Sequence, residues 1–118
     1  MSDFPIFMKN PLNRIASSSQ YTEDIEGYVF DGADGSQAAF WSCANDRVSA
    51  DHTHEFDEYV FVIQGKCAVM MGDNLVELSA GEELLIPKGT PQKMMVSAGT
   101  RTVHLFGGKR ARRAQEGQ

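Results

Sequence analysis

The chain has 118 residues, of which 42% are hydrophobic and 23% are charged, a composition typical of one globular domain with its own core. The formal net charge of −5 argues against nucleic-acid binding over the whole surface, and no apolar run approaches the roughly 20 residues of a membrane span. The N-terminus lacks the basic and apolar regions of a signal peptide, and Cys43 and Cys67 do not form a close pair. We therefore expect a cytoplasmic protein with reduced thiols that binds neither nucleic acid nor membranes.

Residues 1–27 are predicted to form an arm outside the regular fold. Apolar side chains occupy positions 4, 6, 7 and 8, whereas Pro5 and Pro11 argue against a regular helix. We expect this arm to pack on the domain or on a second subunit. A frayed terminus is the alternative.

Residues 28–107 have the pattern of an all-β domain. Short apolar runs rich in β-branched and aromatic residues alternate with glycine, proline and asparagine at hairpin spacing. Strands are predicted at 27–30, 38–43, 59–63, 66–71, 75–78, 83–87, 92–96 and 101–106. Many short strands at this spacing are typical of a β-sandwich or barrel.

The C-terminal segment, residues 108–118, is basic. Lys109, Arg110, Arg112 and Arg113 follow two glycines and lie close together. A contact with an anionic partner is one interpretation of such a cluster. A solvated, disordered tail is the one we adopt, because charged termini are common, and we assign this segment no function.

The first sequence motif with chemical content is formed by His52, His54 and Glu58. Two histidines one residue apart leave the same face of an extended strand, and Glu58 precedes the apolar run Tyr59–Ile63. If Glu58 begins a neighbouring strand, its carboxylate can meet both imidazoles. Two histidines and one carboxylate suit a divalent transition metal. The alternative is a coincidental match on the surface, since short motifs give false positives.

A second motif, GEELLIPKG, begins at Gly81. Gly81 provides a turn conformation that residues with a Cβ resist, and Pro87 and Gly89 then bend the chain back toward the first motif. Gln92 stands three residues after Gly89. This bend predicts that Gln92 approaches the histidines.

Together the two motifs resemble those of the cupin superfamily over about residues 40–106. The first cupin motif, HxHxxxE followed by six residues and Gly, fits His52, His54, Glu58 and Gly65. The second, G followed by five residues, PxG, two residues and His, fits Gly81, Pro87 and Gly89. The resemblance implies a double-stranded β-helix, or jelly roll, as a single all-β barrel domain over residues 28–107.

The departure that matters is Gln92, which replaces the usual third histidine. Some cupins, such as phosphomannose isomerases, are similar in having a glutamine among their metal ligands. The resemblance implies a divalent transition metal (Fe²⁺, Zn²⁺, Ni²⁺ or Mn²⁺) held by His52, His54, Glu58 and Gln92. Two alternatives remain open. Either three ligands hold the metal and Gln92 contacts the substrate, or the site is degenerate and holds no metal.

The period of two along a strand extends this site into a pocket. If Glu58 and Gln92 face inward, so do Val60, Val62, Met94 and Val96, which we expect to form an apolar substrate pocket. The opposite face, with Tyr59, Phe61 and Ile63, is also apolar. A homodimer packed sheet on sheet explains that surplus.

Two functions remain. The first is a metal-dependent enzyme with oxygenase, isomerase or lyase chemistry on a small organic molecule, in which Glu58 and His104 are the catalytic candidates. His104 is expected to be a hydrogen-bonded core or pocket histidine rather than a further metal ligand. The second is a binding module for a small molecule or metal, favoured by the missing third histidine. A storage role is disfavoured because storage cupins usually have two domains.

Overall fold

The computed structural model describes residues 3–115 of the chain. Within that range the strands are β1 (Ile25–Asp31), β2 (Gln37–Cys43), β3 (Arg47–Val48), β4 (Glu58–Gln64), β5 (Lys66–Met71), β6 (Asn74–Ser79), β7 (Glu83–Ile86), β8 (Gln92–Val96) and β9 (Thr100–Phe106). Three single-turn 3-10 helices precede them, namely η1 (Ile6–Met8), η2 (Pro11–Asn13) and η3 (Ser17–Ser19).

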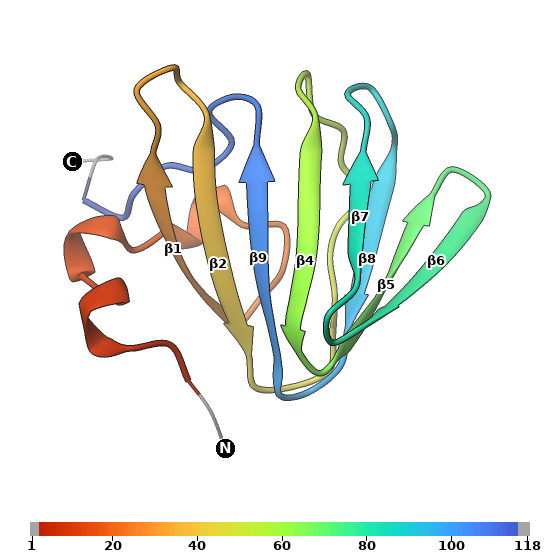
Figure 1. Ribbon diagram of the computed structural model, residues 1–118, viewed down its shortest axis with the longest axis horizontal. Coiled ribbons are helices and arrows are strands. Elements are labelled where there is room, and N and C mark those ends of the chain that lie inside the picture. Colours follow the sequence, from red (N-terminus) through yellow and green to blue (C-terminus); the bar gives the residue numbers. More distant parts are fainter. Residues whose placement is uncertain (1–2, 116–118) are drawn as a thin grey trace.

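The strands form two antiparallel sheets. One has the order β1-β2-β9-β4-β7 and the other the order β3-β8-β5-β6, so β1-β2 and β5-β6 are consecutive strands, whereas the other neighbouring strands are separated in sequence. Figure 1 shows the first sheet across the molecule and the second beside β7, with the three 3-10 helices on the β1 side. This is the jelly-roll barrel that the sequence predicted.

The predicted strands agree closely with the observed ones. β5 and β8 have the predicted bounds, and most other strands extend one or two residues further. The sequence missed β3, because two residues carry no periodicity. β3 exists because it pairs with β8, with Arg47 opposite Val96 and Val48 opposite Met95.

The barrel interior is filled from alternate positions of both sheets. Val60 and Val62 of β4 and Val69 of β5 have no exposed surface, and Ile86 of β7 is 1% exposed. They belong to one cluster that also includes Cys43, Cys67, Leu78, Met94 and Val96. Burying each such aliphatic side chain contributes about 1.5–3 kcal/mol, which makes this cluster the stabilising centre beneath the site.

The N-terminal arm covers part of the outer face of the five-stranded sheet. Phe4 is buried, and its ring lies 4.6 Å from that of Phe40 on β2. Tyr28 of β1 completes this cluster, and Met8 packs against its edge. The arm thereby shields aromatic side chains that β1 and β2 direct away from the barrel interior.

Residues 109–115 of the C-terminal segment lie against the domain, where the sequence predicted a solvated tail. The buried side chain of Gln37 accepts hydrogen bonds from the backbone nitrogens of Arg110 and Ala111, both at 2.8 Å, and donates one to the oxygen of Ala111 at 3.0 Å. Ala111 is fully buried beside Ile15. A buried amide that requires partners and an apolar contact thus outweigh the charge of the segment. The last three predicted tail residues, 116–118, lie outside the described range.

No helix within residues 3–115 is long and apolar enough to cross a membrane.

Candidate metal centre

The site is assembled from a loop and three strands. His52 and His54 lie in the loop before β4, Glu58 begins β4, Gln92 begins β8 and His104 lies on β9. The sequence predicted an extended strand for the two histidines. Instead, only His52 makes an isolated bridge, through backbone hydrogen bonds of 3.0 and 2.9 Å to Gln92. This bridge ties the loop to β8 and brings the two motifs together.

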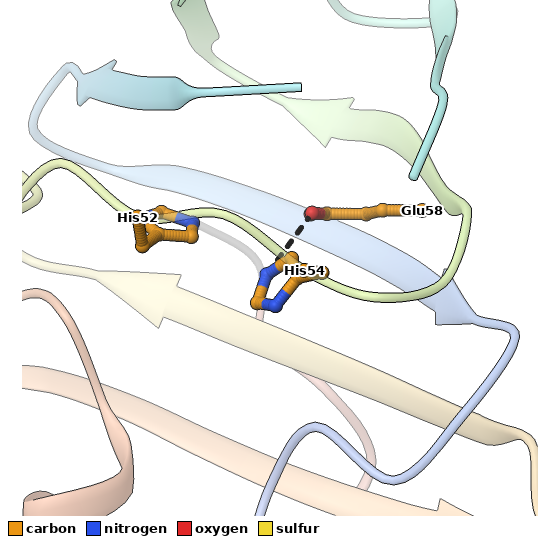
Figure 2. A group of neighbouring side chains, drawn as sticks. All are labelled: His52, His54 and Glu58. Atoms are coloured by element: carbon orange, nitrogen blue, oxygen red, sulfur yellow. Dashed lines mark ion pairs between the residues drawn. The ribbon is translucent and has the colours of Figure 1, made fainter. Parts of the chain in front are cut away.

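His54 and Glu58 face one another across a short gap. His54 Nε2 lies 3.6 Å from Glu58 Oε1, and both side chains are buried (dashed line in Figure 2). The separation is too long for a hydrogen bond. Donor atoms of His52, His54 and Glu58 all lie within 4.8 Å of one another. Metal–ligand bonds of about 2.0–2.2 Å place two donors of one ion about 3–3.6 Å apart, so this gap suits an ion.

The tautomer of His52 follows from its hydrogen bond. Its Nδ1 lies 2.9 Å from the carbonyl oxygen of Ala50, which can only accept, so Nδ1 carries the proton. Nε2 is therefore left with a free lone pair. A backbone contact that fixes the tautomer of a histidine is the usual support for a metal ligand.

The amide of Gln92 is oriented by Glu58. Gln92 Nε2 donates to Glu58 Oε1 at 3.0 Å, because a carboxylate accepts and does not donate. Gln92 Oε1 is consequently directed away from Glu58. The oxygen, which is the metal-binding atom of an amide, is the one left available.

Two buried polar atoms at the site have no hydrogen-bond partner, namely His54 Nε2 and Gln92 Oε1. An unsatisfied buried polar atom costs about 1–3 kcal/mol, so native structures rarely leave two together without a reason. An amide oxygen has lone pairs, and an imidazole nitrogen offers one when the other ring nitrogen carries the proton. The donor set therefore fits a divalent transition ion, which His52, His54, Glu58 and Gln92 would hold.

The protonation states suit such an ion. Burial lowers the pKa of His54 to about 4 and also lowers the pKa of His52, so both imidazoles are neutral near pH 7. Burial alone would raise the pKa of Glu58, but hydrogen bonds from His104 and Gln92 outweigh it and lower the pKa. Metals bind neutral imidazole and ionised carboxylate, so little proton release would accompany binding.

His104 is the hydrogen-bonded pocket histidine that the sequence predicted. Its Nδ1 lies 2.8 Å from Glu58 Oε2 and its Nε2 lies 3.0 Å from Thr102 Oγ1. Nδ1 therefore carries the proton that the carboxylate accepts, and Nε2 shares a hydrogen bond with the Thr102 hydroxyl. With both nitrogens engaged, His104 holds Glu58 in position.

A cavity of about 60 Å³ opens beside these residues. Met94 and Val96 line it, together with Trp41 and Phe106. Val60 and Val62 do not line it. They are inward-facing and fully buried in the core cluster that also contains Met94 and Val96, and their role in a substrate pocket stays a prediction. Strand parity predicts the face of a residue but not its depth.

The cavity also includes residues that the sequence did not indicate. Gln20, Tyr21 and Thr22 of the arm and Arg110 of the C-terminal segment form part of its wall. The Tyr21 ring stacks on His52 at 4.1 Å with an interplanar angle of 3°. Nothing in the local sequence links these positions to the barrel, because both segments reach it only through tertiary contacts.

Comparison with solved structures places the fold among known proteins. The polyketide cyclase RemF from Streptomyces resistomycificus has a TM-score of 0.70 at 17% identity, over 96% of this chain and 84% of that one. KdgF from Halomonas sp. gives 0.67 at 20% identity, over 81% and 93%. An RmlC-like cupin from Shewanella frigidimarina gives 0.67 at 15%, over 80% and 88%. At these identities the similarity shows the fold alone.

No protein with a curated function matches the sequence. The family model described as "Cupin domain" matches residues 40–107, which is more than half of the chain and includes both motifs. The chain therefore belongs to the cupin family.

Proposed function

We propose that this protein is a divalent-metal-dependent enzyme acting on a small organic molecule, with His52, His54, Glu58 and Gln92 as the metal ligands. The observation that carries the proposal is the pair of buried, unpartnered donor atoms, His54 Nε2 and Gln92 Oε1, beside a cavity. At a minimum of about 10–15 Å³ for each water, a cavity of about 60 Å³ has room for several waters or for a small organic ligand.

A divalent ion at this site would act as a Lewis acid on a substrate oxygen. The chain's own residues would position Glu58 through His104 and Gln92, and would exclude water with Met94, Val96 and Phe106. We propose Glu58 and His104 as the residues on which turnover depends. The fold shared with a polyketide cyclase is compatible with chemistry on a small organic substrate.

A binding module without turnover is the second candidate. The observation that favours it is that both oxygens of Glu58 already accept hydrogen bonds from Gln92 and His104. The carboxylate is thus stabilised within the protein even without an ion. A site that no longer binds metal would keep this arrangement.

Elemental analysis of protein purified without an affinity tag or chelator tests the proposal. A near-stoichiometric content of iron, zinc, nickel or manganese supports the metal site, and its absence supports the binding module. Oxygen uptake that depends on Fe²⁺ would then indicate an oxygenase. Turnover with Zn²⁺ and without oxygen would indicate an isomerase or lyase.

Replacing Gln92 with histidine should tighten metal binding by about 10-fold, because imidazole is a better ligand than an amide for these ions. Competition with a fluorescent chelator measures the affinity. Lys88→His, which adds a histidine at an exposed position of the preceding turn, is the matched control. If Gln92→His and the unaltered protein bind metal with equal affinity, Gln92 is not a metal ligand and its role would be to contact the substrate.

We also propose that a second copy of the chain covers the outer face of the five-stranded sheet. Register places one row of side chains across all five strands on that face, and the row runs Phe30, Ala38, Leu105, Tyr59 and Leu85. Phe30, Leu105 and Leu85 are 39%, 45% and 57% exposed. A continuous exposed apolar row of this kind is typical of an interface.

Leu105→Arg should therefore shift the protein from dimer to monomer, because a charge in the centre of the row would lose its water on association. Sedimentation velocity measures the change. Leu75→Arg is the control, since Leu75 is 52% exposed on β6 of the other sheet. A monomeric unaltered protein, or a Leu105→Arg variant that remains dimeric, contradicts the proposed interface.

A further inference from the structure

The cavity contains one cation whose charge has no partner. Arg110 lies in the wall, and none of the ion pairs within residues 3–115 involves it. Arg14, Arg47 and Arg113 differ, because each pairs with a carboxylate near the surface. The Arg110 guanidinium donates to the carbonyl oxygen of Ser19, which carries no charge.

Aromatic rings surround this guanidinium. Its carbon lies 4.7 Å from the ring centre of Tyr21, 5.2 Å from that of Trp41 and 5.8 Å from that of Phe106. Such contacts attract a cation but do not neutralise it. Burial lowers the pKa of Arg110, the expected result for a cation that has lost water without gaining an anion. An arginine nevertheless keeps its charge at neutral pH.

The chain holds Arg110 in place before any ligand binds. The buried Gln37 side chain accepts a 2.8 Å hydrogen bond from the Arg110 backbone nitrogen and also donates to Asp31 Oδ1 at 2.9 Å. The three aromatic rings and the hydrogen bond to Ser19 hold the guanidinium in place. A preorganised cation loses less conformational entropy on binding a ligand, which is the arrangement expected of a recognition residue.

The charge of the cavity favours an anion. Among the described residues that line it, Glu58 is the only acidic one, and its hydrogen bonds go to Gln92 and His104 rather than to Arg110. With a divalent ion bound, the site would have a net positive charge. An anionic ligand would balance that charge in a region of low dielectric, where the attraction is strong.

We propose that Arg110 binds the carboxylate of the substrate, and hence that the substrate is a small organic acid. The planar guanidinium forms paired hydrogen bonds with a carboxylate, while a second oxygen of the same molecule faces His52, His54 and Glu58. A carboxylate fits the small, aromatic-walled cavity better than the bulkier phosphate group. This inference rests on the proposed function for its second contact, but the contact with Arg110 requires no metal.

The experiment follows the fluorescence of Trp41, the only tryptophan of the chain, which lies beside Arg110. Succinate is the probe, with its neutral diamide and inorganic phosphate as comparisons. Each is titrated into metal-loaded and into chelator-treated protein. The variants are Arg110→Gln, Arg110→Lys and, as the matched control, Arg112→Gln, which removes the same charge from an exposed position two residues away. Metal content and thermal unfolding are recorded for each.

Succinate should saturate the signal, and Arg110→Gln should weaken binding on the order of 10- to 100-fold while leaving metal content unchanged. Arg110→Lys keeps the charge but not the planar fork, so it should lose less, and it replaces Arg110→Gln as the test if that variant unfolds. Arg112→Gln should bind as the unaltered protein does. The diamide and phosphate should bind more weakly than succinate.

Three outcomes overturn the inference. The first is that the fluorescence signal does not saturate by about 10 mM succinate. The second is that folded Arg110→Gln binds succinate as tightly as the unaltered protein does. The third is that the diamide or phosphate binds as tightly as succinate. Failure of the proposed function is separable. Protein that contains no metal but binds succinate through Arg110 refutes the metal site and retains the anion site. Metal-loaded protein that binds succinate equally well without Arg110 retains the metal site and refutes the anion site.

Discussion

Protein carrying His54→Ala should purify almost free of metal, with an affinity at least about 100-fold below that of the unaltered chain. Changes to residues that only hydrogen-bond to a metal ligand typically cost 10- to 100-fold in metal affinity, and this variant removes a direct ligand. His54 is buried, its Nε2 has no hydrogen-bond partner, and its pKa near 4 keeps it neutral, so little besides metal binding depends on that nitrogen. Elemental analysis and chelator competition measure the loss.

The control for His54→Ala is Thr53→Ala, an exposed position between the two histidines. It alters the same loop and should keep its metal content. The two variants should unfold at similar denaturant concentrations after chelator treatment, apart from the packing of the His54 ring between Phe56 and Phe106. Stoichiometric metal retained in His54→Ala would refute the assignment of the site.

Glu58→Ala should lower the free energy of unfolding by about 2–4 kcal/mol even without metal. The carboxylate accepts hydrogen bonds from Gln92 Nε2 and His104 Nδ1, and both donors are buried. Its removal leaves two donors unsatisfied and a cavity at the start of β4. Urea titration in the presence of a chelator measures this loss in the free energy of unfolding separately from the stabilisation that a bound metal would add.

Glu55→Ala provides the comparison, since Glu55 is exposed in the same loop and its loss should change stability by no more than about 0.5 kcal/mol. Glu58→Gln should fall between the two, because an amide oxygen accepts from one donor while its nitrogen opposes the other. A Glu58→Ala variant as stable as Glu55→Ala would show that Glu58 does not organise the site.

Much of the barrel was determined by local sequence. The bounds of β5 and β8 were predicted because alternating apolar residues and glycine turns are properties of a few consecutive positions. The same holds for the spacing of His52, His54 and Glu58, which placed three donor atoms within 4.8 Å once the loop joined β4. These features need no knowledge of distant contacts.

The tertiary structure alone decided the rest. Met94 and Val96 reach the cavity while Val60 and Val62 lie beneath it, because depth depends on how the two sheets pack and strand parity does not encode it. Arg110 is far from the motifs in sequence and resembles a solvated tail residue. It enters the cavity wall because Gln37, 73 positions earlier on β2, requires buried hydrogen-bond partners and finds them in that segment's backbone. The hydrogen bonds that the buried Gln37 amide requires are therefore made with a segment distant in sequence, and they place that basic segment beside the site.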